Sequence, residues 1–286
     1  MFEIFNTREI ALFFWSIIIL TWILSKMESW GSFKKVLSTF FSDKIITPIL
    51  LSIIYAETII LILALFDYWD LKFLKDTLFW FIGSAIISIF NANKATENPD
   101  YFKKNILDNI KFIIVFEFII NFYTLPLFWE IILIPFLLII SLADKIFQDR
   151  KEIATKKFTT GILTIFGIFL LSFSITNLVK NFEAFASLNT LKIFLLPIIL
   201  TVLFIPFTYL LAVYMKYENM FIFVGFRFKN KQQEFNKIKW RIFKFCLFNL
   251  NKQIKLRRLQ SFSYIMSLDD LNKTINEYKS PVANNG

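Results

Sequence analysis

The chain has 286 residues, of which 56% are hydrophobic and only 6 are glycine, and its formal net charge is +10. It contains no histidine and a single cysteine, Cys246. Histidine-dependent catalysis, internal disulfides and CxxC metal or redox motifs are therefore excluded. We expect no enzymatic activity, no catalytic residues, no metal site and no cofactor.

The apolar residues are gathered in long runs separated by charged stretches. A helix needs about 20 apolar residues to cross the hydrocarbon core of a bilayer. The pattern predicts an all-α, polytopic membrane protein with about seven transmembrane helices and a basic, helical, cytoplasmic C-terminal region. The predicted spans are at about 9–25, 45–66, 77–90, 106–124, 127–143, 160–179 and 191–215. The third of these, 77–90, is short and can be lengthened by Phe73 and Leu74.

The distribution of basic residues predicts the orientation of these spans. With seven spans, the connections on one side hold 4 Lys and Arg, and those on the other side hold 26. Because basic loops stay on the cytoplasmic side, the N-terminus is expected outside and the C-terminus in the cytoplasm. The segment 30–41 mixes aromatic residues with two lysines, which predicts a helix lying at the inner membrane surface.

Two acids fall in the middle of predicted spans without a lysine or arginine at comparable depth. Glu57 lies in the second span, and Glu117 lies in the fourth, where it shares a helix face with Asn121 and Thr124. An ionisable residue inside the membrane indicates function. These four residues are candidates for lining an ion pathway, although protonated hydrogen bonds between helices would also explain the acids. Glu130, near the outer end of the fifth span, is expected to reach the interface.

The C-terminal tail is strongly basic, with 12 Lys or Arg and 2 acids in residues 216–260. Apolar residues recur there at helical spacing beside the cations. This pattern is typical of an amphipathic helix on anionic lipid. A site for an anionic cytosolic ligand, such as a nucleotide or oligonucleotide, is the competing interpretation. The candidate binding residues are Lys237, Arg241, Lys244, Lys252, Lys255, Arg257 and Arg258.

These patterns divide the chain into three parts. Residues 1–215 form a transmembrane helical domain, 216–279 a basic cytoplasmic helical domain, and 280–286 a disordered tail. Within the second part, 267–278 is predicted to be a short helix capped by Ser267, with Asp270 three residues later.

Two functions remain after enzymes are set aside. A secondary transporter would use the intramembrane carboxylates. Transporters usually contain helices broken by glycine or proline and internal repeats, whereas only three glycines fall in the predicted spans here and no repeat is evident. An oligomeric ion channel or depolarising effector, gated from the cytoplasm, fits the acids and the basic tail together. We therefore favour a homo-oligomeric channel in contact with membrane lipids, and keep the transporter as the alternative.

The segments FNTREIALFFW, KDTLFWF and FEFIINFYTLP resemble those of bacterial multi-span proteins of anti-phage defence loci. The overall plan, a bundle of spans with a cytosolic element, is similar to membrane effectors of nucleotide-signalling systems such as CBASS and Hailong. The resemblance implies a bacterial inner-membrane protein that acts in abortive infection, and it leaves room for a regulatory partner protein. It carries no diagnostic motif, so no site residue is transferred from it.

Overall fold

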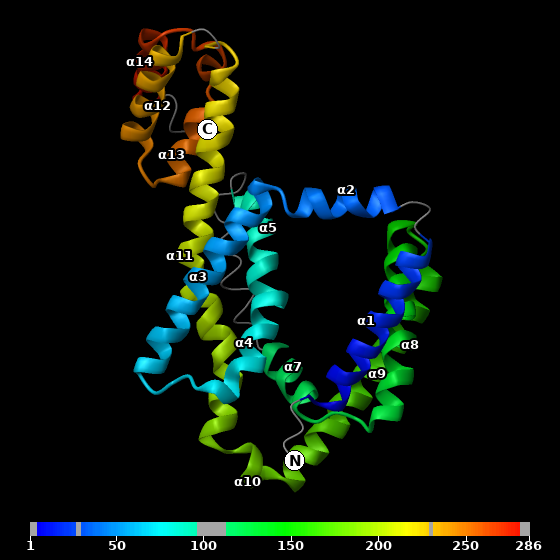
Figure 1. Cartoon of the computed structure of the whole chain (residues 1–286). Helices are drawn as coiled ribbons and strands as arrows, with labels where there is room; N and C mark the ends of the chain where they lie inside the picture. Colours follow the sequence, from blue (N-terminus) through cyan, green and yellow to red (C-terminus); the bar gives the residue numbers. More distant parts are fainter. Residues whose placement is uncertain (1–4, 27–29, 96–112, 229–230, 281–286) are drawn as a thin grey trace. The chain divides into compact units, whose positions relative to one another are not determined.

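The computed structural model describes residues 5–26, 30–95, 113–228 and 231–280, and every regular element in these ranges is a helix (Figure 1). The predicted all-α class is thus confirmed for the described residues. The longer helices are α1 (Thr7–Lys26), α2 (Trp30–Phe40), α3 (Asp43–Leu65), α4 (Leu74–Trp80), α5 (Ile86–Ala95), α7 (Ile113–Phe122), α8 (Leu127–Asp149), α9 (Ile153–Lys180), α11 (Leu188–Gly225), α12 (Gln232–Cys246), α13 (Leu250–Arg258) and α14 (Leu268–Lys279). The shorter elements are η1 (Leu71–Phe73), the π-helical η2 (Phe81–Ala85), α10 (Phe182–Phe185) and η3 (Gln260–Tyr264).

Six helical segments of the described ranges are long and apolar enough to cross a membrane. They are Thr7–Ser25, Asp43–Leu65, Leu71–Ala92, Leu127–Asp149, Ile153–Lys180 and Leu188–Gly225. They coincide with six of the seven predicted spans and support a multi-pass membrane protein. The predicted span at 106–124 is described only from α7 onwards, which has 10 residues, and its first part lies outside the described residues. A seventh span therefore stays a prediction.

Two further predictions, on the length of the third span and on a helix at 30–41, are confirmed. The third span begins at Leu71 and runs through η1, α4, η2 and α5, so it includes the lengthening towards Phe73 and Leu74. The predicted helix at 30–41 is α2, whereas its place at the membrane surface stays a prediction.

The chain packs into two units, of which the first comprises residues 1–45 and 110–196. In this unit α8 and α9 form a hairpin, α1 packs along α8, and α7 packs along α9 (Figure 1). The Asp144 carboxylate on α8 accepts hydrogen bonds from the hydroxyls of Thr159 (2.6 Å) and Thr160 (2.7 Å) on α9. These bonds join the two helices close to the turn that connects them.

The second unit comprises residues 46–109 and 197–286. Here α3 packs against α11: the Tyr55 ring lies 5.3 Å from that of Phe207, and the Tyr55 hydroxyl donates to the Leu203 carbonyl (3.1 Å). The Trp80 indole on α4 donates to the Thr201 hydroxyl (2.9 Å), which ties the third span to the same helix. The buried face of α3 consists of Ile49, Ser52, Ala56 and Ile59.

Helix α11 has 38 residues, which corresponds to about 57 Å and exceeds the ~30 Å of a hydrocarbon core. The predicted boundary between residues 215 and 216 falls inside this helix. After α11, α12 runs back along it. The Phe235 ring lies 3.0 Å from where a Cβ of Gly225 would stand, and the Phe243 ring lies 5.7 Å from that of Tyr217.

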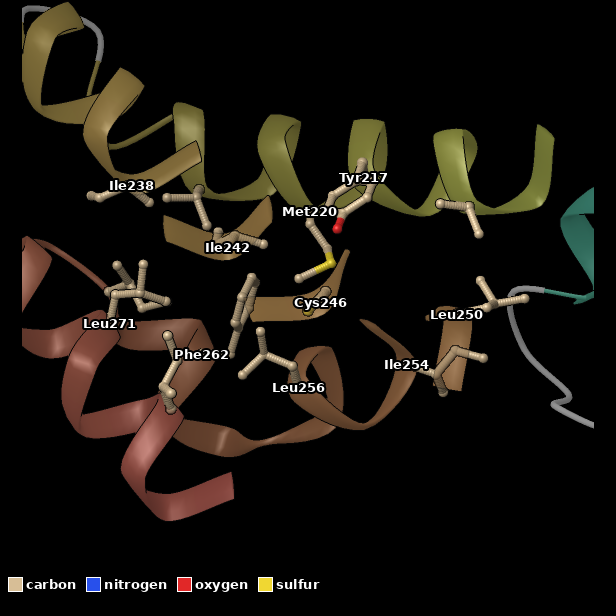
Figure 2. Packing of buried hydrophobic residues seen from close by; sticks show 14 of the residues in the cluster. Tyr217, Met220, Ile238, Ile242, Cys246, Leu250, Ile254, Leu256, Phe262 and Leu271 are labelled. Atoms are coloured by element: carbon tan, nitrogen blue, oxygen red, sulfur yellow. The ribbon is translucent and has the colours of Figure 1, made fainter. Parts of the chain in front are cut away.

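The last part of α11 and helices α12 to α14 share a hydrophobic core, which we call the C-terminal bundle. In Figure 2 the side chains of Ile242, Cys246 and Phe262 gather beneath Met220 of α11. The Ser267 hydroxyl accepts a hydrogen bond from the Asp270 backbone N–H (3.2 Å), so the predicted capped helix is confirmed as α14. Residues 281–286 of the predicted tail lie outside the described residues.

Candidate functional site

A polar cluster joins the start of α1 to the end of α7 and the start of α8. The Arg8 guanidinium lies 2.9 and 3.1 Å from the two carboxylate oxygens of Glu130, and it donates to the Ile120 carbonyl (3.1 Å) and the Asn121 side-chain oxygen (3.0 Å). The Leu125 N–H adds a bond to Glu130 (3.0 Å). Because Glu130 is only 2% exposed, this carboxylate is neutralised inside the protein rather than by water.

The expectation that Glu130 reaches the interface is therefore wrong. Glu130 lies in the first turn of α8. The backbone of Leu125, in the connection between α7 and α8, donates a hydrogen bond to its carboxylate, and Arg8 supplies the countercharge. Sequence reasoning missed this pair because the two residues are 122 positions apart. The predicted topology contained the signal, since it places both residues at the same end of their spans.

A local capping motif fixes Arg8 in place. The Asn6 side chain accepts from the Glu9 N–H (2.8 Å), and the Asn6 N–H donates to the Glu9 carboxylate (2.8 Å). In this reciprocal capping box Asn6 is the cap residue, and α1 begins with the next residue, Thr7. The Thr7 hydroxyl lies 2.7 Å from the Thr124 hydroxyl. The segment FNTREIALFFW thus carries both the cap and the cation of the cluster.

Three of the predicted pathway residues lie on or just after α7. Asn121 and Thr124 form hydrogen bonds with the start of α1, so within one chain they join helices. Glu117 lies in α7, and its side chain is outside what the structure describes. Whether these residues also line an ion pathway stays a prediction.

Glu57, the fourth predicted pathway residue, is exposed on the surface of α3. It lies about 120° around the helix from the centre of the buried face, at 100° per residue. The neighbouring exposed side chains, Leu50, Ile53 and Leu61, are apolar. Within the described residues, the Glu57 carboxylate forms no hydrogen bond or ion pair. A single chain therefore presents an acid on an otherwise apolar membrane-spanning face.

The candidate cations of the C-terminal bundle are mostly on its surface. The apolar stripe of α12, including Ile238, Ile242 and Cys246, is buried in the bundle core, so this stripe packs on protein rather than on lipid. The Arg241 guanidinium donates to the Asn272 side chain of α14 (3.0 Å), and thereby joins two helices at the surface. The exposed candidates are Lys237, Arg241, Lys244, Lys252, Lys255 and Arg258.

Arg257 differs from the other candidates because its guanidinium lies against two aromatic rings. Its guanidinium carbon lies 3.8 Å from the centre of the Phe223 ring and 5.6 Å from that of Phe262. Burial, and secondly the charge of Arg227, lower the pKa of Arg257. This contact is a cation–π interaction that holds α13 to α11. Arg257 is thus less available to a ligand than its neighbour Arg258.

Two features of the described residues bear on metal and cofactor binding. Among the described residues, no group of three or more His, Cys, Asp or Glu side chains is placed to bind a metal ion. A groove of about 630 Å³ between α11 and α12 is lined mainly by aromatic rings, with Glu218 and Lys239 as its charged members. The Lys239 ammonium lies over the Phe235 ring (4.3 Å), so it is used in packing.

Comparisons with known proteins add no family. No protein-family model, no curated protein and no solved structure matches this chain.

Proposed function

We propose that this protein is a homo-oligomeric ion channel of the bacterial inner membrane, gated from the cytoplasm, which depolarises the cell during anti-phage abortive infection. The observation that carries the proposal is the exposed carboxylate of Glu57 in the middle of α3. A charge at mid-bilayer costs on the order of 3 kcal/mol on insertion scales when it faces lipid. An assembly in which Glu57 borders water between copies avoids this cost.

The second unit supplies a route from a cytoplasmic signal to Glu57. The C-terminal bundle includes the last part of α11, and the same helix packs on α3 through Tyr55, which is two residues from Glu57. Since α11 is one continuous helix, a ligand that shifts the bundle would act on the helix pair that carries the acid. The exposed cations of α12 and α13 favour an anionic ligand, such as a nucleotide or oligonucleotide.

Ion conduction is tested by expressing the protein in bacteria that contain a membrane-potential dye. Wild-type protein should depolarise the cells, and Glu57→Gln should reduce this effect strongly at equal expression. Glu183→Gln is the matched control, because Glu183 is an exposed acid on α10, outside the six candidate spans. Equal depolarisation by all three proteins would overturn the role of Glu57. Substrate-dependent uptake without depolarisation would instead favour the transporter.

The anionic ligand is tested separately with the purified full-length protein in detergent. Binding of labelled oligonucleotides should weaken when Lys237, Lys255 and Arg258 are replaced by glutamine. The same variant should keep its helical content, because all three side chains are exposed. Unchanged oligonucleotide binding combined with weaker binding to anionic liposomes would assign these cations to lipid.

The role in defence rests on the resemblance of three segments to anti-phage membrane proteins. Its test is plaque formation on cells that express wild-type or Glu57→Gln protein. Protection by wild type alone would support abortive infection through ion conduction. Equal plaque numbers on wild-type and empty cells, for a broad phage panel, would argue against it.

A further inference from the structure

The turn between α12 and α13 carries two exposed apolar side chains in a strained backbone. Leu247 has φ 48° and ψ −133°, a conformation that favours glycine. Leu247 is 53% exposed and Phe248 is 60% exposed. A strained turn that points large apolar groups outwards needs a reason, because strain of this kind persists where the surroundings impose it and often serves function.

Two tyrosines of α11 hold this turn in place. The Tyr217 hydroxyl donates to the Leu247 carbonyl (2.6 Å), and the Tyr209 hydroxyl donates to the Phe248 carbonyl (2.8 Å). The N–H of Leu250, at the start of α13, donates back to the Tyr209 hydroxyl (3.3 Å). The turn is thus fixed at a defined height on α11.

That height is where the uncharged part of α11 ends. Residues 193–215 contain no charged side chain, and Lys216 follows them. This run is about 34 Å long at 1.5 Å per residue, enough for a hydrocarbon core of ~30 Å. Tyr217 lies just beyond the run, and Tyr209 lies about 10 Å before Lys216. The turn therefore lies beside the last turns of the membrane-spanning part of α11.

The surroundings of the turn have the chemistry of a membrane interface. Trp240 on α12 is 62% exposed, and it is linked through Phe243 to Phe248 by edge-to-face ring contacts of 5.8 and 6.2 Å. The Lys244 ammonium lies 6.0 Å from the Trp240 ring. Exposed aromatic rings beside lysines are characteristic of the headgroup region, where the rings enter the boundary and the cations meet phosphates.

We propose that the Leu247–Phe248 turn, together with Trp240, inserts into the lipid headgroup region and anchors the C-terminal bundle to the membrane face where α11 emerges. Lys244 and Lys252, on either side of the turn, contact lipid phosphates. The partner is the lipid surface, with a preference for anionic headgroups. This inference rests on α11 crossing the membrane and is independent of ion conduction by the protein.

The test uses the full-length protein in vesicles of phosphatidylcholine and phosphatidylglycerol. In a Cys246→Ala background, the Phe248→Cys variant carries a fluorophore, and lipids with a shallow nitroxide serve as quenchers. The control label is placed by Gln233→Cys near the other end of α12, about 20 Å along the helix from Cys246. We expect the nitroxide lipids to quench the label at position 248 at least about two times as strongly as the label at position 233.

Equal quenching at both positions, or free access of an aqueous quencher to position 248, would overturn the proposal. Shielding from both lipid and aqueous quenchers would also overturn it, because protein, such as a second copy, would then cover the turn. A Tyr209→Phe and Tyr217→Phe double variant tests the geometry. It should lose most of the lipid quenching at position 248 while the bundle stays folded, as monitored by helical content.

Discussion

The guanidinium of Arg8 and the carboxylate of Glu130 meet in a two-bond ion pair, with N–O distances of 2.9 and 3.1 Å, although 122 positions separate them in the chain. The pair ties α1 to α8, and Arg8 also bonds the end of α7. Glu130, in the first unit, thus has its countercharge within the same chain. Glu57, in the second unit, has no countercharge among the described residues. We therefore infer that Glu57, exposed in the middle of α3, borders water or a partner from outside the chain.

Removing one member of the buried pair should destabilise the protein. Arg8→Ala leaves Glu130 buried without a countercharge, and we expect a loss of about 3–5 kcal/mol in the free energy of unfolding. The measurement is unfolding in mixed detergent micelles. Lys72→Ala is the control, because the Lys72–Asp70 pair is 55% and 52% exposed and should contribute about 1 kcal/mol or less. An Arg8→Met, Glu130→Leu double variant should recover most of the loss, and equal effects of Arg8→Ala and Lys72→Ala would contradict the structural role.

In the strained turn at Leu247, a substitution is expected to stabilise the protein rather than destabilise it. Leu247→Gly should raise the free energy of unfolding by about 1 kcal/mol, because glycine adopts positive φ without steric cost. Phe248→Gly is the matched control, since Phe248 has no positive φ, and it should be neutral or destabilising. Both variants should weaken the anchoring of the bundle to lipid. If Leu247→Gly destabilises the protein as much as Phe248→Gly, the turn is not strained.

Cys246 reports on the integrity of the C-terminal bundle. Burial raises the pKa of its thiol from 9.0 to about 12, so the folded bundle holds the unreactive, protonated form at neutral pH. We expect maleimide to label Cys246 slowly in the native protein and rapidly after denaturation. Rapid labelling under native conditions would contradict the buried core.

The same shift in pKa sets the effect of alkaline pH. Above about pH 9 the thiol ionises in the unfolded chain but stays protonated in the folded one, so the wild-type protein loses stability as the pH rises. Cys246→Ala lacks this loss. The difference in the free energy of unfolding between the two proteins should therefore narrow between pH 9 and 12, and a constant difference would show that the thiol is not desolvated.

The sequence predicted the features that depend on local composition. Apolar runs located the six candidate spans among the described residues, because crossing a bilayer requires length and hydrophobicity and little else. The capped helix α14 was also predictable, because Ser267 and Asp270 form a motif within a few residues of sequence.

Features that depend on distant partners were not predictable from local patterns. The apolar stripe of α12 was recognised, but a stripe does not reveal whether it packs on lipid or on protein, and Met220 and Val224 of the extended α11 supply the protein partner. Glu130 was expected at the interface because its cation, Arg8, lies 122 positions earlier in the sequence. Arg257 looked like its basic neighbours, and only the Phe223 ring sets it apart.

Ion conduction by the proposed route requires Glu57 to border water, and cysteine accessibility measures this directly. In membranes that contain the Glu57→Cys, Cys246→Ala variant, a negatively charged, water-soluble thiol reagent should modify position 57 and restore part of the ionic current that is lost with the carboxylate. Ile62→Cys is the reference, because Ile62 is also exposed on α3 but lies about 140° around the helix. We predict faster modification at position 57 than at position 62. Equal, slow modification at both positions, with no effect on current, would place Glu57 in lipid or in a dry interface and would contradict the channel.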